Sequence, residues 1–192
     1  MHNLTKEILK GKFEKTDKEG EIYLPQAKVF VGGVFEHWVN DDLDGLQADG
    51  NLVVNEGLDH LLDVTLSGGT QKSNWYVGIN KANYTFLATD TAQNVSTNST
   101  EVTGSGDVSE IARPAWTEPG VVSQSITNAA AAAAYTATAG VTIYGAFLIS
   151  SPTYGNNAAS DKLLAASAFA SPRALINTDV LNVTYTLNIA DA

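Results

Sequence analysis

The stretch Val180-Leu-Asn-Val-Thr-Tyr-Thr-Leu-Asn-Ile189 alternates apolar and polar side chains. Side chains two residues apart lie on the same face of a β-strand, so Val183, Tyr185 and Leu187 share one face with Ile189. A second stretch, Val141-Thr-Ile-Tyr-Gly-Ala-Phe-Leu-Ile149, is almost continuously apolar, which is typical of a central strand. Together the two stretches predict a protein built from β-strands.

Shorter stretches with strand composition occur along the rest of the chain, and turn residues separate them. They lie at residues 21–24, 28–40, 75–79, 108–117, 121–127, 131–138 and 163–169. Six alanines, Ala129–Ala134, favour helix by propensity, but their Thr-, Val- and Tyr-rich flanks favour a strand. Residues 89–106 are polar and predict a surface loop. The pattern predicts an all-β fold, a β-sandwich or jelly-roll-like domain over residues 21–192.

One helix is expected among the strands, at about residues 55–66. Leu58, Leu61, Leu62 and Leu66 recur at helical spacing, so we expect them to share the buried face. Asn55 has the composition of an N-cap, and Ser67-Gly-Gly-Thr70 ends the pattern. The acidic residues of this helix, Glu56, Asp59 and Asp63, are expected on its solvated face.

Charge is unevenly distributed along the 192 residues, whose formal net charge is −10. Residues 1–28 hold six lysines and five acidic residues, whereas the rest of the chain holds five basic and sixteen acidic residues. Residues 1–20 therefore predict a distinct N-terminal arm, either a disordered tail or a segment that orders on a partner. The acidic balance argues against direct binding of nucleic acid.

The sequence lacks the signals of several kinds of functional site and cellular location. The chain has no cysteine, which excludes disulfides and thiolate zinc sites and fits folding in a reducing cytoplasm. No apolar run is long enough for a membrane span, and the N-terminus lacks the pattern of a signal peptide. His2, His37 and His60 have no metal-binding spacing, so surface or capping roles are expected. The sequence predicts no catalytic, cofactor-binding or metal-binding residues and indicates that the protein is not an enzyme.

A series of blocks over about residues 50–190 resembles a family of tailed-phage virion proteins. The blocks begin with Asn51-Leu-Val-Val-Asn-Glu-Gly-Leu-Asp-His-Leu-Leu-Asp-Val-Thr65 and Trp75-Tyr-Val-Gly-Ile79. They continue with Ala112-Arg-Pro-Ala-Trp-Thr117, Ile143-Tyr-Gly-Ala-Phe-Leu-Ile-Ser150 and Leu181-Asn-Val-Thr-Tyr-Thr-Leu187. This order of blocks, over about residues 50–190, is similar to that of capsid decoration, or cement, proteins.

The resemblance implies a non-enzymatic β-sandwich on the surface of a phage head. Such a protein binds the major capsid protein, self-associates as a dimer or trimer, and staples neighbouring subunits of the mature shell. The other readings left open are a head fibre, a tail or baseplate accessory, a host-glycan-binding module and, least favoured, an enzyme. The predicted capsid contacts are in the arm and in one later segment: Leu4, Lys6, Ile8, Lys10, Lys12, Lys15, Arg113 and Trp116.

Overall fold

The computed structural model describes residues 29–104, 106–155 and 157–191, and residues 31–188 form one compact unit. The arm at residues 1–20 and the expected strand at 21–24 lie outside the described residues. The described strands are β1 (Val29–Val39), β2 (Gln47–Gly50), β3 (Leu52–Val53), β4 (Tyr76–Asn80), β5 (Ser125–Thr127), β6 (Ala133–Thr136), β7 (Val141–Ile149), β8 (Leu163–Leu175) and β9 (Val180–Asp191). The helical elements are α2 (Asn55–Leu62), the π-helical turn η2 (Asp63–Ser67) and the single turn α3 (Val95–Asn98).

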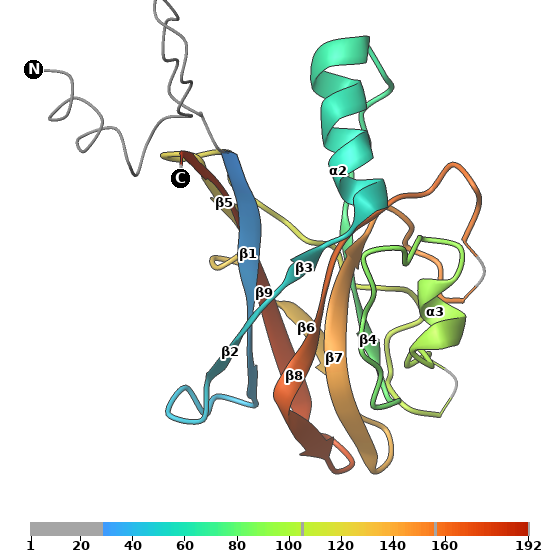
Figure 1. Ribbon diagram of the computed structural model, residues 1–192. Helices are drawn as coiled ribbons and strands as arrows, with labels where there is room; N and C mark the ends of the chain where they lie inside the picture. Colours follow the sequence, from blue (N-terminus) through green and yellow to red (C-terminus); the bar gives the residue numbers. More distant parts are fainter. Residues whose placement is uncertain (1–28, 105, 156, 192) are drawn as a thin grey trace, which may run out of the picture. The chain divides into compact units, whose positions relative to one another are not determined.

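The strands form two antiparallel sheets (Figure 1). The first sheet has the order β2-β1-β9-β5, and β6 also pairs with β9. The second sheet has the order β3-β8-β7-β4. This arrangement confirms the predicted all-β, sandwich-like fold, although it does not establish jelly-roll connectivity. No helix of the described residues is long and apolar enough to cross a membrane.

The main core lies between the two sheets. The first sheet contributes Phe35 from β1 and alternate residues of β9, including Val183 and Tyr185. The second sheet contributes Ile143 of β7 and Phe169 of β8, among others. Phe35 and Tyr185 stack with ring centroids 4.4 Å apart. The alternation of β9 that predicted a strand therefore places its apolar face in this core.

A second core covers the outer face of the second sheet. Phe147 and Ile149 of β7 point into it, together with Leu163 of β8. They pack against Phe86 and Val95, which belong to residues 81–102, here called the cover segment. β7 is therefore buried on both faces, which explains its continuous apolar sequence.

The cover segment corrects the prediction of a surface loop over residues 89–106. Many of its side chains are buried: Phe86, Asp90, Ala92, Val95, Ser96, Ser99, Glu101 and Val102. Its polar residues satisfy its own backbone, as when the Asp90 carboxylate accepts hydrogen bonds from the Leu87 amide (2.8 Å) and the Tyr84 hydroxyl (3.0 Å). Internal hydrogen bonding of this kind lets a polar sequence pack inside a protein.

Two asparagines complete the sheets where strands are interrupted. Asn51 links β2 of the first sheet to β3 of the second, and its amide donates a hydrogen bond to the Tyr185 hydroxyl (2.8 Å). Asn128 lies between β5 and β6 beside β9, where its side-chain oxygen accepts the Tyr185 amide hydrogen (2.7 Å). Each side chain therefore satisfies polar groups at a break in the strand pairing.

Three sequence predictions need adjustment in their extent. The alanine-rich segment forms strand β6, as expected, but residues 108–117 make only isolated bridges at Val108 and Ala115. Pro114 instead accepts a backbone hydrogen bond from Val77 (3.0 Å). Only residues 125–127 of the expected strand 121–127 form β5, because Ser123 and Gln124 adopt positive φ angles in a turn.

The helix occupies the expected place, but its buried face is rotated from the predicted one. Val54, not Asn55, is its N-cap residue. Gly57 and His60 are buried, whereas Leu62 is 57% exposed and Leu66 is 80% exposed. The cause is the close approach of α2 to β8, since a Cβ atom at Gly57 would lie 2.4 Å from the Leu164 carbonyl oxygen. Only glycine permits this contact, so the Gly57 side of the helix faces the sheet.

We expect Gly57→Ala to lower the free energy of unfolding by about 2 kcal/mol, because the new methyl group overlaps the β8 backbone. Urea denaturation measures this change. Gly50→Ala is the matched control, since nothing lies within 4 Å of a Cβ atom at Gly50, and a change below about 0.5 kcal/mol is expected. Equal losses in the two variants would contradict the packing of α2 on β8.

Candidate functional site

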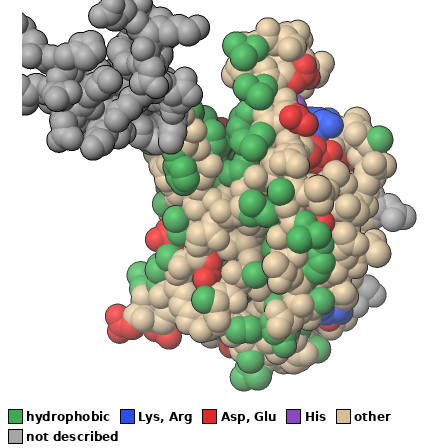
Figure 2. Space-filling view, in the orientation of Figure 1, with side chains coloured by type: hydrophobic (Ala, Val, Ile, Leu, Met, Phe, Trp, Pro, Cys, Tyr) green, Lys and Arg blue, Asp and Glu red, His purple; other side chains and the backbone are tan. Residues whose placement is uncertain are grey.

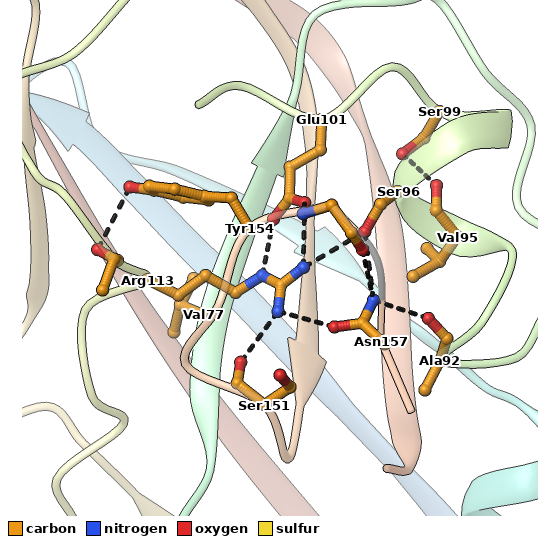
Figure 3. Close-up of polar contacts among 12 residues, drawn as sticks. Val77, Ala92, Val95, Ser96, Ser99, Glu101, Arg113, Ser151, Tyr154 and Asn157 are labelled. Carbon is orange, nitrogen blue, oxygen red and sulfur yellow. Dashed lines mark hydrogen bonds and ion pairs between the residues drawn. The ribbon is translucent and has the colours of Figure 1, made fainter. Parts of the chain in front are cut away.

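The most extensive cluster of buried polar groups surrounds the Arg113 guanidinium (Figure 3). The Arg113 side chain is fully buried, and that of Glu101 is 2% exposed. Two parallel hydrogen bonds join them, from Nε to Oε1 (2.5 Å) and from Nη2 to Oε2 (2.8 Å). A bidentate pair of this geometry is the strongest form of arginine–carboxylate contact. Because both side chains are buried, each charge needs the other to compensate for its loss of contact with water.

The remaining donors of the Arg113 guanidinium bind three further groups. Nη1 donates to the Ser151 carbonyl oxygen (2.8 Å) and to Asn157 Oδ1 (3.0 Å). Nη2 also donates to Ser96 Oγ (3.1 Å). An arginine has five N–H groups, and all five are used here. The guanidinium therefore has no donor left for a substrate, and its role is to tie the cover segment to the loop after β7.

Neighbouring side chains extend this cluster. Asn157 donates to the Ala92 carbonyl oxygen (2.6 Å), and the Gly155 amide donates to Glu101 Oε2 (2.9 Å). The Tyr154 hydroxyl donates to the Ala112 carbonyl oxygen (3.1 Å). Burial, with the nearby carboxylate of Glu110, raises the pKa of Tyr154 to about 12. Tyr154 thus stays protonated at neutral pH and acts as a hydrogen-bond donor.

A second internal cluster is centred on His37 of β1. Arg173 Nε donates to His37 Nδ1 (2.8 Å), so that nitrogen carries the lone pair and Nε2 donates to Asp49 (2.9 Å). The ring stacks on Phe169 with centroids 3.6 Å apart. Burial lowers the pKa of His37, which favours the neutral ring that this arrangement requires. The expectation of a surface or capping histidine is wrong here, because Asp49, Arg173 and the aromatic ring enclose His37.

The third polar feature is an open cleft of about 540 Å³ between α2 and the cover segment. Its lining comprises Asn55, Glu56, Asp59, His60, Asp63, Ala88, Thr89, Asp90, Thr91 and Lys162. Figure 2 shows acidic side chains, a basic side chain and a histidine gathered at this side of the helix. The cleft is the strongest candidate for a binding site, because the carboxylates of Asp59 and Asp63 are exposed in it.

Glu56 holds one side of this cleft in place. Its Oε2 atom accepts hydrogen bonds from the Ala92 and Leu163 amides, both at 2.8 Å. Its Oε1 atom lies 3.7 Å from Lys162 Nζ. The prediction that Glu56 belongs to a solvated face is therefore wrong. Its carboxylate joins α2, the cover segment and β8.

Arg113 and Trp116 are not surface contacts, which corrects their predicted place in a capsid interface. They are 2% and 8% exposed, and the Trp116 indole N–H donates to the Tyr185 carbonyl oxygen (3.0 Å). No local sequence pattern predicts the partner Glu101, which lies in the segment predicted to be a polar surface loop. The other predicted contacts, Leu4, Lys6, Ile8, Lys10, Lys12 and Lys15, lie outside the described residues.

Neither the arrangement of possible metal ligands nor the comparison with known proteins assigns a function to these clusters. Among the described residues, no group of three or more histidine or acidic side chains is arranged to hold a metal ion. No protein-family model matches the chain, and a search of curated proteins finds no match. The functional argument therefore rests on the residues and their contacts.

We expect Glu101→Gln to lower the free energy of unfolding by about 3 kcal/mol, because it leaves the buried Arg113 charge without its counter-ion. Asp107→Asn is the matched control, since Asp107 pairs with the partly exposed Lys81 (2.6 Å) and its loss costs less than about 1 kcal/mol. Chemical denaturation measures both values. A small effect of Glu101→Gln would show that the buried pair is not a structural tie.

We expect the free energy of unfolding to fall as the pH drops below about 6.5. Unfolded His37 takes up a proton there, whereas folded His37 stays neutral because burial lowers its pKa. The pKa of His60 is lowered as well, so its contribution has the same sign. Urea titrations across this range measure stability, and ring NMR shifts assign the protonation of each histidine. A His37 ring that charges at its ordinary pKa in the folded protein would contradict this.

Proposed function

We propose that the chain is a non-enzymatic capsid decoration protein that binds and bridges major capsid subunits on the surface of a tailed-phage head. The support comes from two features of the described residues. Polar side chains that carry chemistry in many enzymes serve here as internal ties, as at Arg113 and His37. Large apolar side chains, in contrast, are exposed on loops that hydrogen bonds join to each other and to the sheet.

The observation that carries the proposal is a loop tip, made of residues 40–46 and 176–179, in which apolar side chains are exposed beside acidic ones. Leu43 and Ile176 are 65% and 70% exposed, and Leu46 is also exposed. Asn40 joins the two loops, since its backbone amide donates to the Val180 carbonyl oxygen (2.7 Å) and its side chain donates to Asp179 (3.0 Å). Arg173 also donates to the Gly45 carbonyl oxygen (2.7 Å).

Exposed apolar side chains on loops of this kind are typical of a protein-binding site. The hydrogen bonds between the loops hold their backbone, so less backbone entropy is lost when a partner covers them. The loop tip therefore suits the docking of a folded partner such as a capsid subunit.

The mechanism follows from linkage between binding and assembly. A protein that binds only the expanded shell stabilises that shell by mass action. Copies that each contact two subunits, or that self-associate as dimers or trimers, gain further from the high effective concentration of neighbouring sites. The shell would then resist the internal pressure of packaged DNA at the boundaries between subunits.

A host-glycan-binding module is the second candidate, and one groove favours it. Trp75, Trp116 and Glu118 line a groove of about 200 Å³ with Asn74 and Thr117. Aromatic rings beside a carboxylate are a common way to bind sugars. The groove is small and Trp116 is mostly buried, so the loop tip carries more weight.

We expect the purified chain to co-sediment in a saturable manner with expanded phage heads and not with unexpanded procapsids, and to bind the expanded heads more weakly when residues 1–20 are deleted. Ile176→Asp should weaken this binding at least about tenfold, because a charge replaces an apolar contact. Ile111→Asp is the matched control, since Ile111 is 94% exposed and lies away from the loop tip in the sequence. Failure to bind either shell would contradict the proposed function, and binding to a glycan array would then support the second candidate.

A further inference from the structure

His60 is a buried polar side chain without a partner, and it lines the cleft beside α2. The residue is 7% exposed, and neither ring nitrogen makes a hydrogen bond within the part of the chain that the structure describes. The His60 ring lies beside that of Trp75, with 5.9 Å between the ring centroids. By comparison, both nitrogens of His37 are satisfied. The His60 ring is mostly covered, but its nitrogens are not among the fully buried atoms that lack a partner, so they reach the cleft and can accept a hydrogen bond from a ligand there.

Two carboxylates at the mouth of the cleft are also uncommitted. Asp59 and Asp63 lie one helical turn apart, and both are exposed. Within the described residues, their carboxylate oxygens make no hydrogen bond and no ion pair. Asp90 and Glu56 also line the cleft, but backbone amides and hydroxyls occupy them. Lys162 is the one basic residue in the lining. The cleft is thus strongly negative and rich in acceptors.

An apolar ridge lies next to these carboxylates. Leu62 and Leu66 follow Asp59 and Asp63 by three residues, a spacing that makes them neighbours on a helix surface. Both leucines are mostly exposed. The surface therefore combines an acidic cleft with an apolar edge, and a complementary partner has a cationic side chain flanked by apolar ones.

We propose that this cleft binds an arginine side chain from an apolar segment of a partner protein, with Asp59, Asp63 and His60 as its acceptors. A guanidinium presents five donors in a plane, which two carboxylates and a neutral imidazole can accept, whereas no group of three such side chains among the described residues is arranged to hold a metal ion. Burial lowers the pKa of His60, which keeps the ring neutral and able to accept a hydrogen bond. The inference rests on the proposed function in one respect: the partner is then a capsid subunit.

The test uses the full chain and the peptide acetyl-Leu-Arg-Leu-amide, with the citrulline analogue as its neutral, isosteric control. NMR titration at about pH 7.5 follows the His60 ring and the backbone amides. We expect saturable shifts with a dissociation constant on the order of millimolar, weakened by added salt, and at least about tenfold weaker binding of the citrulline peptide.

The matched variants are Asp59→Asn with Asp63→Asn, and Asp107→Asn as the control. The first pair should weaken peptide binding at least about tenfold, whereas the control removes a charge at a partly exposed position outside the cleft and should change peptide binding less than about twofold. Equal binding of both peptides, or no effect of the paired variant, would overturn the proposal. So would Zn²⁺ binding at His60 without peptide binding. Capsid co-sedimentation with failed peptide binding would overturn only this inference, whereas the reverse result would overturn only the proposed function.

Discussion

The second sheet must bury both of its faces, and the rest of the domain is arranged around that requirement. β7 carries apolar side chains toward the first sheet, such as Ile143 and Leu148, and toward the opposite side, such as Phe147 and Ile149. Without a cover, the side chains of Phe147 and Ile149 would be exposed to water, which is unfavourable for apolar surface. The cover segment removes that surface from water, and α3 and Phe86 belong to it.

Covering a sheet with a polar segment creates its own cost, because every buried amide and charge needs a partner. The Arg113 guanidinium meets much of this need by binding Glu101 and Ser96 of the cover segment and the loop after β7. Glu56 does the same at the helix, where its carboxylate accepts the Ala92 and Leu163 amides. The charged groups of this protein are thus divided between internal ties and an acidic outer surface.

The strands and the helix could be predicted because their signals are local. The alternation of β9 and the apolar run of β7 depend only on neighbouring residues, and both strands form where expected. The cover segment could not be predicted, since its burial depends on Arg113 and Asn157, which are distant in sequence from Glu101 and Ala92.

The buried face of the helix could not be predicted for a similar reason. Leucine spacing favoured Leu62 and Leu66, but the steric demand of Leu164 selects Gly57. Of the candidate cleft, the sequence indicated only the acidic helix residues.

Hydrogen–deuterium exchange of the cover segment tests this account most directly. If residues 81–102 are part of the core, the Val102 amide, which donates to the Ile79 carbonyl oxygen (2.9 Å), should exchange about as slowly as the amides of β7. The amides of α3 should be protected as well. Exchange of the whole segment at the rate of an exposed loop, while β7 stays protected, would contradict the claim that a polar cover held by Arg113 completes the fold.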